Sequence, residues 1–130
     1  MHYIFVYGTL MKKCPPNEWS AFLEENAVYV DEAAVEGGLY KVDFYPGLVK
    51  EKGTVYGEVF ALNKASETLA FLDEYEDYRI NDKTNSLYLR ESSIAKLVRT
   101  DKIVKTWVYY YNKPSDGLKK YDSGVFISPE

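Results

Sequence analysis

Cysteine and histidine are almost absent from this chain, which has one of each in 130 residues, Cys14 and His2. A single cysteine cannot form an internal disulfide, and the two residues together cannot supply the four ligands of a Cys/His zinc site. A Ser-His-Asp triad would depend on His2, which lies beside the first residue and is poorly placed as a rigid base. We therefore expect no metal and no cofactor. Any chemistry must use carboxylates, hydroxyls and backbone groups.

An excess of basic residues is also lacking, since 16 Lys and Arg face 20 Asp and Glu and give a net charge of −4. This balance argues against a nucleic-acid partner bound through its phosphates. The longest apolar runs, such as 4–6 and 107–111, are too short to span a bilayer, and the N-terminal residues do not resemble a signal peptide. We expect a cytoplasmic protein with no membrane partner, folded as a single domain over 1–130 and present as a monomer or homodimer.

Aromatic residues, by contrast, are abundant, and 13 of them are tyrosines, which suit half-buried strands and pocket walls. Short apolar runs bounded by turn residues predict several strands. They lie over 2–6, 27–40, 54–62, 87–98 and 103–111, with Gly37-Gly38 dividing the second into two. A turn is expected at Tyr45-Pro46-Gly47, because proline followed by glycine suits a type II turn.

Two helices are predicted between these strands. Asn17 is a candidate N-cap for the first, and Asn63 for a second over 64–75. The strands outnumber the helices, so the fold class is α+β. Many strands of moderate length with glycine breaks favour a small mixed β-barrel with flanking short helices, and a flat open sheet is the main alternative.

Glu76 belongs to an acidic cluster, 73–77, at the end of the second predicted helix. The apolar stripe of this helix is Ala65, Leu69 and Leu72, and its next position is 76. Glu76 is therefore expected to face the protein, where desolvation would raise its pKa toward the range of a general acid/base. Asp73, Glu74 and Asp77 are expected to point more outward. The alternative interpretation is that the whole cluster is a solvated helix end.

Two further features are candidates for binding. The segment Tyr7-Gly8-Thr9-Leu10 follows the first strand, where a glycine can bend the backbone and expose consecutive N–H groups to an anion. Tyr88 and Arg90 lie two residues apart, hence on one face of a strand. The alternatives are an ordinary strand-ending turn for the first feature, and cross-strand packing with a rim charge for the second.

Taken together, these segments resemble the γ-glutamylcyclotransferase-like family, which includes the AIG2-like proteins. The resemblance runs in order along nearly the whole chain. It is carried by Phe5 to Leu10, Gly38-Leu39-Tyr40, Tyr45 to Val49, Val55 to Phe60, Leu72 to Glu76, Tyr88-Leu89-Arg90, Val108 to Tyr111 and Ser123-Gly124.

The resemblance implies a small β-barrel and a pocket at the end of its first strand. It implies that Glu76 is the acid/base, that Tyr7, Gly8, Thr9 and Leu10 hold a γ-glutamyl group, and that Tyr88 is a pocket tyrosine. The implied activity is release of 5-oxoproline and a free amine from a small γ-glutamyl substrate, without a cofactor. The loop 79–86 is expected to border the leaving amine. A non-catalytic small-ligand-binding module or an interaction protein on the same fold is the alternative.

The chain departs from the family pattern at two places. Asp77 follows Glu76 where relatives usually have glycine, so it must adopt the same backbone path at some cost or the path differs. A like charge next door would also disfavour ionised Glu76. Val125-Phe126 stands in the tail where relatives often have Asp-Trp.

Overall fold

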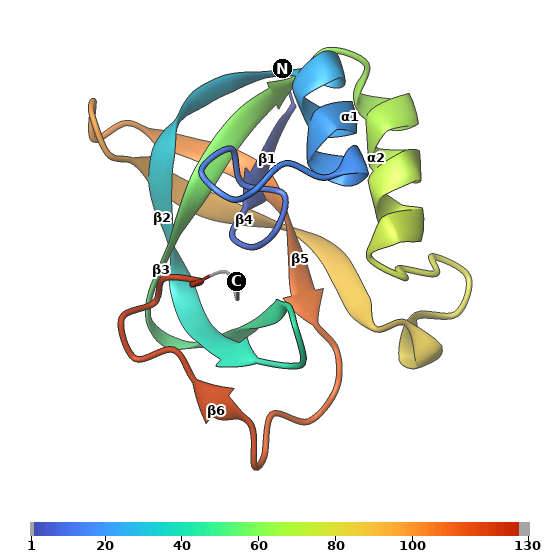
Figure 1. Ribbon diagram of the computed structural model, residues 1–130, viewed down its shortest axis with the longest axis vertical. Coiled ribbons are helices and arrows are strands. Elements are labelled where there is room, and N and C mark those ends of the chain that lie inside the picture. Colours follow the sequence, from blue (N-terminus) through green and yellow to red (C-terminus); the bar gives the residue numbers. More distant parts are fainter. Residues whose placement is uncertain (1, 128–130) are drawn as a thin grey trace.

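Five strands form a closed mixed barrel in the computed structural model, which describes residues 2–127 (Figure 1). The predicted barrel is thus confirmed over the flat open sheet. Two helices lie side by side against the outside of the barrel. In chain order the elements are β1 (Tyr3–Val6), α1 (Glu18–Asn26), β2 (Ala27–Lys41), β3 (Pro46–Leu62), α2 (Ala65–Tyr75), a short 3₁₀ helix (Lys83–Asn85), β4 (Tyr88–Leu97), β5 (Ile103–Tyr111) and β6 (Lys119–Lys120).

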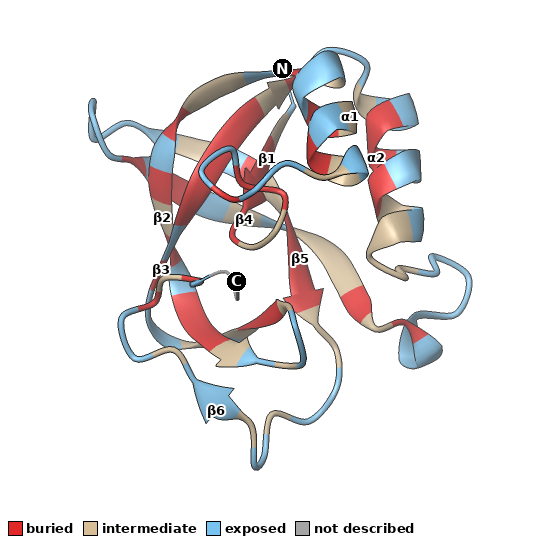
Figure 2. Cartoon of the chain, in the orientation of Figure 1, coloured by how far each residue is buried: buried red, intermediate tan, exposed pale blue. Residues whose placement is uncertain are grey.

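The barrel is built from long antiparallel pairs, β2 with β3 and β4 with β5. Strand β1 pairs antiparallel with β3 and touches β5 in parallel at Ile4 and Trp107. Contacts of β2 with β4 and of β3 with β5 complete the ring. The inward side chains of these strands form the core, and Figure 2 shows the buried stretches of β2 to β5 interrupted by more exposed ones, whereas β1 is almost continuously buried.

Helix α1 begins as predicted, because the Asn17 side chain accepts hydrogen bonds from the N–H groups of Trp19 and Ser20. Its buried Leu23 faces the barrel, while Phe22 stacks on Phe71 of α2 at 3.8 Å between ring centroids. The predicted cap of the second helix is wrong. Lys64 occupies that position, and its side chain makes no capping bond.

Two other local predictions are wrong. Gly37-Gly38 does not divide β2, because the strand continues through a bulge between Glu36 and Gly38 while staying paired with β3. Pro46-Gly47 is not a turn, since Pro46 already pairs with Lys41 at the start of β3. The chain reverses over 42–45, where the Val42 N–H donates to the Tyr45 carbonyl.

Candidate functional site

The candidate site is a cavity of about 260 Å³ at the carboxyl end of β1. Its walls come from 5–10, from 45–46 where the β2–β3 turn meets β3, from 75–76 at the end of α2, from 87–88, and from Tyr109 on β5. At about 30 Å³ per water molecule, it has room for roughly eight or nine waters, the size of a small ligand. The six residues predicted to form the site, Tyr7, Gly8, Thr9, Leu10, Glu76 and Tyr88, line this one cavity. Arg90, the other candidate, does not line it.

Glu76 is the only ionisable carboxyl in the described lining, which contains no lysine, arginine or histidine. The residue is partly exposed, and no described residue forms a hydrogen bond or ion pair with its side chain. Burial raises the pKa of its carboxyl from the ordinary 4.5 to about 8. Six aromatic rings share the lining with it and keep the surroundings apolar, namely Phe5, Tyr7, Tyr45, Tyr75, Tyr88 and Tyr109.

The backbone that carries Glu76 ends α2 in a Schellman motif. The Tyr78 N–H donates to the Asp73 carbonyl at 2.8 Å, and the Asp77 N–H donates to the Glu74 carbonyl at 3.2 Å. Asp77 has φ +56°, the left-handed conformation for which glycine is preferred at this position. Asp77 therefore adopts the backbone path that glycine would take. Its carboxylate pairs with Arg79 at 3.0 Å, and burial, not this neighbouring charge, raises the pKa of Glu76.

The loop after β1 is fixed by hydrogen bonds to its carbonyl groups. The Gly8 carbonyl accepts a hydrogen bond from the Met11 N–H at 3.0 Å, and the Thr9 carbonyl accepts one from the Asn17 side-chain amide at 3.0 Å. No described residue accepts a hydrogen bond from the N–H groups of Gly8, Thr9 or Leu10. A Cβ on Gly8 would lie 2.9 Å from the ring of Pro46, so a larger residue would force this wall of the cavity to shift.

A buried glutamate fixes the far end of the same loop. Glu58, on β3, is 3% exposed and accepts hydrogen bonds from the N–H groups of Lys12 at 2.5 Å and Lys13 at 3.3 Å. Desolvation raises the pKa of Glu58, although these two hydrogen bonds oppose the rise. The sequence reasoning did not single out this residue. Its signal was a carboxylate inside the otherwise apolar stretch 55–60.

Tyr7 and Tyr88, the two tyrosines predicted to belong to the site, use their hydroxyl groups to join elements of the cavity wall. The Tyr7 hydroxyl donates to the Tyr109 carbonyl at 2.6 Å and accepts from the Leu48 N–H at 3.3 Å. The Tyr88 hydroxyl donates to the Pro46 carbonyl at 2.7 Å. Burial raises the pKa of both phenols, so they stay protonated and neutral. Both hydroxyl groups donate their protons to backbone carbonyls, so the two side chains contribute their rings to the cavity lining.

The expectation that Asp73 points outward is wrong. Its carboxylate accepts hydrogen bonds from Arg90 Nε at 2.7 Å and Nη2 at 3.2 Å, and from the Tyr109 hydroxyl at 2.7 Å. The reason is helical phase: Asp73 lies four residues after Leu69 and three before Glu76, so it shares the inward side of α2. Glu74 is exposed as expected.

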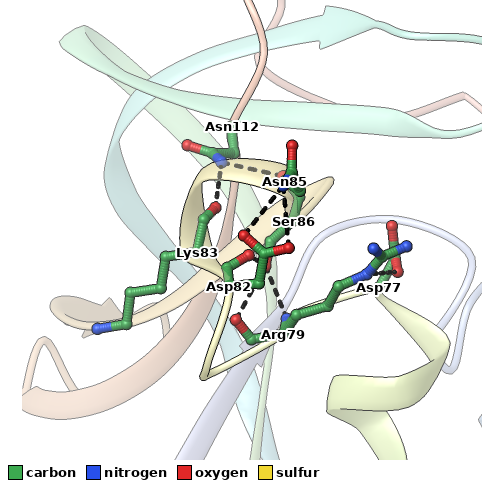
Figure 3. Close-up of polar contacts among 7 residues, drawn as sticks. All are labelled: Asp77, Arg79, Asp82, Lys83, Asn85, Ser86 and Asn112. Carbon is green, nitrogen blue, oxygen red and sulfur yellow. Dashed lines mark hydrogen bonds and ion pairs between the residues drawn. The ribbon is translucent and has the colours of Figure 1, made fainter.

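The loop 79–86 does not line the cavity, contrary to expectation. It folds on itself, as Figure 3 shows, around the fully buried Ser86. The Ser86 hydroxyl bonds to both backbone groups of Arg79, and the Asn112 amide donates to the carbonyls of Lys83 and Ser86 at 2.9 Å each. The loop braces the end of α2, because the Leu87 N–H donates to the Asp77 carbonyl at 3.1 Å.

Among residues 2–127, no three His, Cys, Asp or Glu side chains come together in a way that could hold a metal ion. None of the helices described there is long and apolar enough to cross a bilayer.

The fold and the cavity define a class: a small mixed barrel whose aromatic pocket contains one carboxyl group at a helix end. Comparison with known proteins identifies the family. The family model described as "Gamma-glutamyl cyclotransferase, AIG2-like" matches residues 4–128. The chain belongs to this family.

Individual relatives agree with this assignment. The chain is 34% identical over 125 residues to the gamma-glutamylcyclotransferase family protein YtfP of Escherichia coli K12, covering 95% of each chain. The solution structure of E. coli YtfP matches with a TM-score of 0.55 at 30% identity, over 96% of both chains. The crystal structure of a mouse AIG2-like protein matches with a TM-score of 0.75 at 21% identity, over 100% of this chain and 97% of that one, and shows the shared fold.

Proposed function

We propose that this protein is a γ-glutamylcyclotransferase, which releases 5-oxoproline and a free amine from a γ-glutamyl amine or γ-glutamyl amino acid. The observation that carries the proposal is the Glu76 carboxyl. It lies unpaired among the described residues in an aromatic cavity, and burial raises its pKa to about 8. Family membership supports the same general reaction.

In the proposed reaction, the substrate supplies its own nucleophile. Glu76 takes a proton from the substrate α-ammonium, and the resulting amine nitrogen attacks the γ-carbonyl carbon to close a five-membered ring. Glu76 gives its proton to the departing nitrogen as the original amide C–N bond breaks. The ring nitrogen still carries a second proton and a positive charge, and it passes that proton through Glu76 to the freed amine, which leaves as an ammonium beside neutral 5-oxoproline. A carboxyl of pKa about 8 suits this exchange, because its ionised form is a stronger base than an ordinary carboxylate and its protonated form can still return the proton. No water is consumed.

The loop after β1 supplies the complementary contacts. The N–H groups of Gly8, Thr9 and Leu10 have no described acceptor, and no described cationic side chain lines the cavity. These N–H groups would therefore hold the substrate α-carboxylate or the oxyanion that develops on the γ-carbonyl. The enzyme would contribute mainly by folding the substrate, because well-oriented intramolecular reactions reach effective molarities of about 10⁵–10⁸ M.

The test is 5-oxoproline release by the wild-type protein from γ-glutamyl amino acids, γ-glutamyl-ε-lysine and γ-glutamyl polyamines. The matched control is the N-acetylated form of each compound, in which the amine can no longer attack. We expect release from at least one free-amine substrate and none from its acetylated form. Tight binding of γ-glutamyl compounds without release would contradict the proposal and favour a ligand-binding module.

A further inference from the structure

Asp73 connects the helix that carries Glu76 to two strands of the barrel. Its side chain is 18% exposed, and the side chain of its partner Arg90, on β4, is 15% exposed. Two hydrogen bonds from Arg90 and one from the Tyr109 hydroxyl reach the two Asp73 oxygens, all between 2.7 and 3.2 Å. The Asp73–Arg90 ion pair is bidentate and mostly shielded from solvent, so it fixes the two side chains far better than an exposed ion pair does.

The partners of Asp73 are themselves fixed. The Arg90 guanidinium lies over the Trp107 ring, 4.6 Å from its centroid, and near the Tyr78 ring at 5.7 Å. Tyr109 lines the same cavity as Glu76, and its carbonyl accepts the hydrogen bond from Tyr7. Asp73 does not line the cavity itself, but its hydrogen bond with the Tyr109 hydroxyl connects it to the cavity wall.

The backbone of Asp73 acts on the same turn. Its carbonyl accepts the Tyr78 N–H that closes the Schellman motif around Glu76 and Asp77. The main-chain and side-chain contacts of Asp73 thus hold the last turn of α2, which ends at Glu76, against β4 and β5. A displacement of about 1 Å in a catalytic group can cost on the order of 10²-fold in rate.

We propose that Asp73 is a positioning residue, which holds Glu76 at its working place in the cavity through Tyr109 and Arg90. This inference rests on the proposed function for its kinetic consequences, but its structural content does not. It follows from the inward position of Asp73, which the sequence had indicated as pointing outward.

The kinetic test compares Asp73→Asn and Tyr109→Phe, with Glu74→Gln as the control on the exposed side of the same turn. We expect Asp73→Asn to lower kcat about 10- to 100-fold with KM little changed, because Glu76 moves and the substrate-binding loop does not. Tyr109→Phe removes one hydroxyl and should lower kcat less. The double variant should be no worse than Asp73→Asn, since both changes break one connection. Equal kcat in Asp73→Asn and Glu74→Gln would overturn the proposal.

Amide hydrogen exchange provides a readout that does not need turnover. The Glu76 and Tyr78 N–H groups bond within the final turn of α2, so they should exchange about tenfold faster in Asp73→Asn than in Glu74→Gln, while amides in β3 stay unchanged. Unchanged exchange at Glu76 and Tyr78 would overturn the positioning role even if the wild-type protein released no 5-oxoproline. Wild-type inactivity with accelerated exchange would instead overturn only the proposed reaction.

Discussion

At the scale of single residues, the ionisation of Glu76 sets the expected pH dependence of activity. The proposed first step needs the carboxylate, and in the free protein burial raises the pKa of this group to about 8. We expect kcat/KM to fall as the pH drops below about 8, since Glu76 is then increasingly protonated. The fall in kcat should occur at a lower pH than the fall in kcat/KM, because the α-ammonium of bound substrate stabilises the ionised carboxyl of Glu76 and lowers its pKa. A pH profile of initial rates over pH 5–10 checks both, and a flat kcat/KM between pH 6 and 9 would contradict the role of Glu76.

The same raised pKa predicts a stability effect with a defined sign. The folded state holds the Glu76 proton up to about pH 8, whereas an unfolded glutamate loses it near 4.5. Folding stability therefore falls as the pH rises between these values, and the loss is complete above the folded pKa. Glu76→Gln should be more stable than wild type at pH 9 by roughly 2–4 kcal/mol, with a much smaller gain at pH 4. Urea unfolding at the two pH values measures this, and Glu74→Gln should show no comparable gain.

Residue-scale reasoning from the sequence placed Glu76 correctly because the stripe at 65, 69 and 72 repeats at 76. Asp73 was expected to point outward because only the positions 65, 69, 72 and 76 were assigned to the buried face of the helix. The buried face of an amphipathic helix is wider than one row of residues, and it includes position 73, four residues after Leu69. Glu58 was missed because its partners are backbone N–H groups of a loop, and these have no sequence signature.

At the scale of elements, the turn that ends α2 requires a left-handed backbone conformation at Asp77, which is unfavourable for a residue other than glycine. Asp77 adopts φ +56°, which costs a non-glycine residue on the order of 1 kcal/mol. Asp77→Gly should therefore stabilise the protein by up to about 1 kcal/mol and keep activity, because Glu76 stays in the same turn. The control is Glu74→Gly, which should destabilise by about 1 kcal/mol because position 74 is helical. Thermal unfolding compares the two, and a lower Tm for Asp77→Gly would contradict this account.

The strands show which element boundaries could be predicted. Strands β1, β4 and β5 begin and end near the expected residues. The break expected at Gly37-Gly38 did not occur, because pairing with β3 over the rest of β2 outweighs the local flexibility of two glycines. Long-range pairing of this kind cannot be read from a local window.

At the scale of the whole molecule, the C-terminal segment passes alongside β2 and β3 of the barrel (Figure 1). The Tyr121 N–H donates to the Leu39 carbonyl at 2.8 Å, and the Tyr56 N–H donates to the Gly124 carbonyl at 2.9 Å. Phe126 is 3% exposed and packs edge-on against Tyr121. Phe126 thus anchors this segment to the barrel through a buried aromatic side chain.

Phe126→Ala should accordingly destabilise the protein by about 3–5 kcal/mol, since it removes a buried aromatic ring and leaves a cavity. Ile127→Ala is the matched control, because Ile127 is 70% exposed and should change stability by less than about 0.5 kcal/mol. Chemical unfolding of both variants checks the contrast. Similar losses for the two would mean that the tail does not contribute to the core.

The central claim is that Glu76 moves the proton in an intramolecular cyclisation, and one comparison tests it most directly. It measures 5-oxoproline release by wild type, Glu76→Gln and Glu74→Gln from the best γ-glutamyl substrate. Glutamine keeps the shape of the side chain but cannot carry the proton, so we expect Glu76→Gln to lose at least about 10²-fold in kcat while remaining folded. Glu74→Gln should match wild type. Equal turnover by Glu76→Gln and wild type would contradict the account.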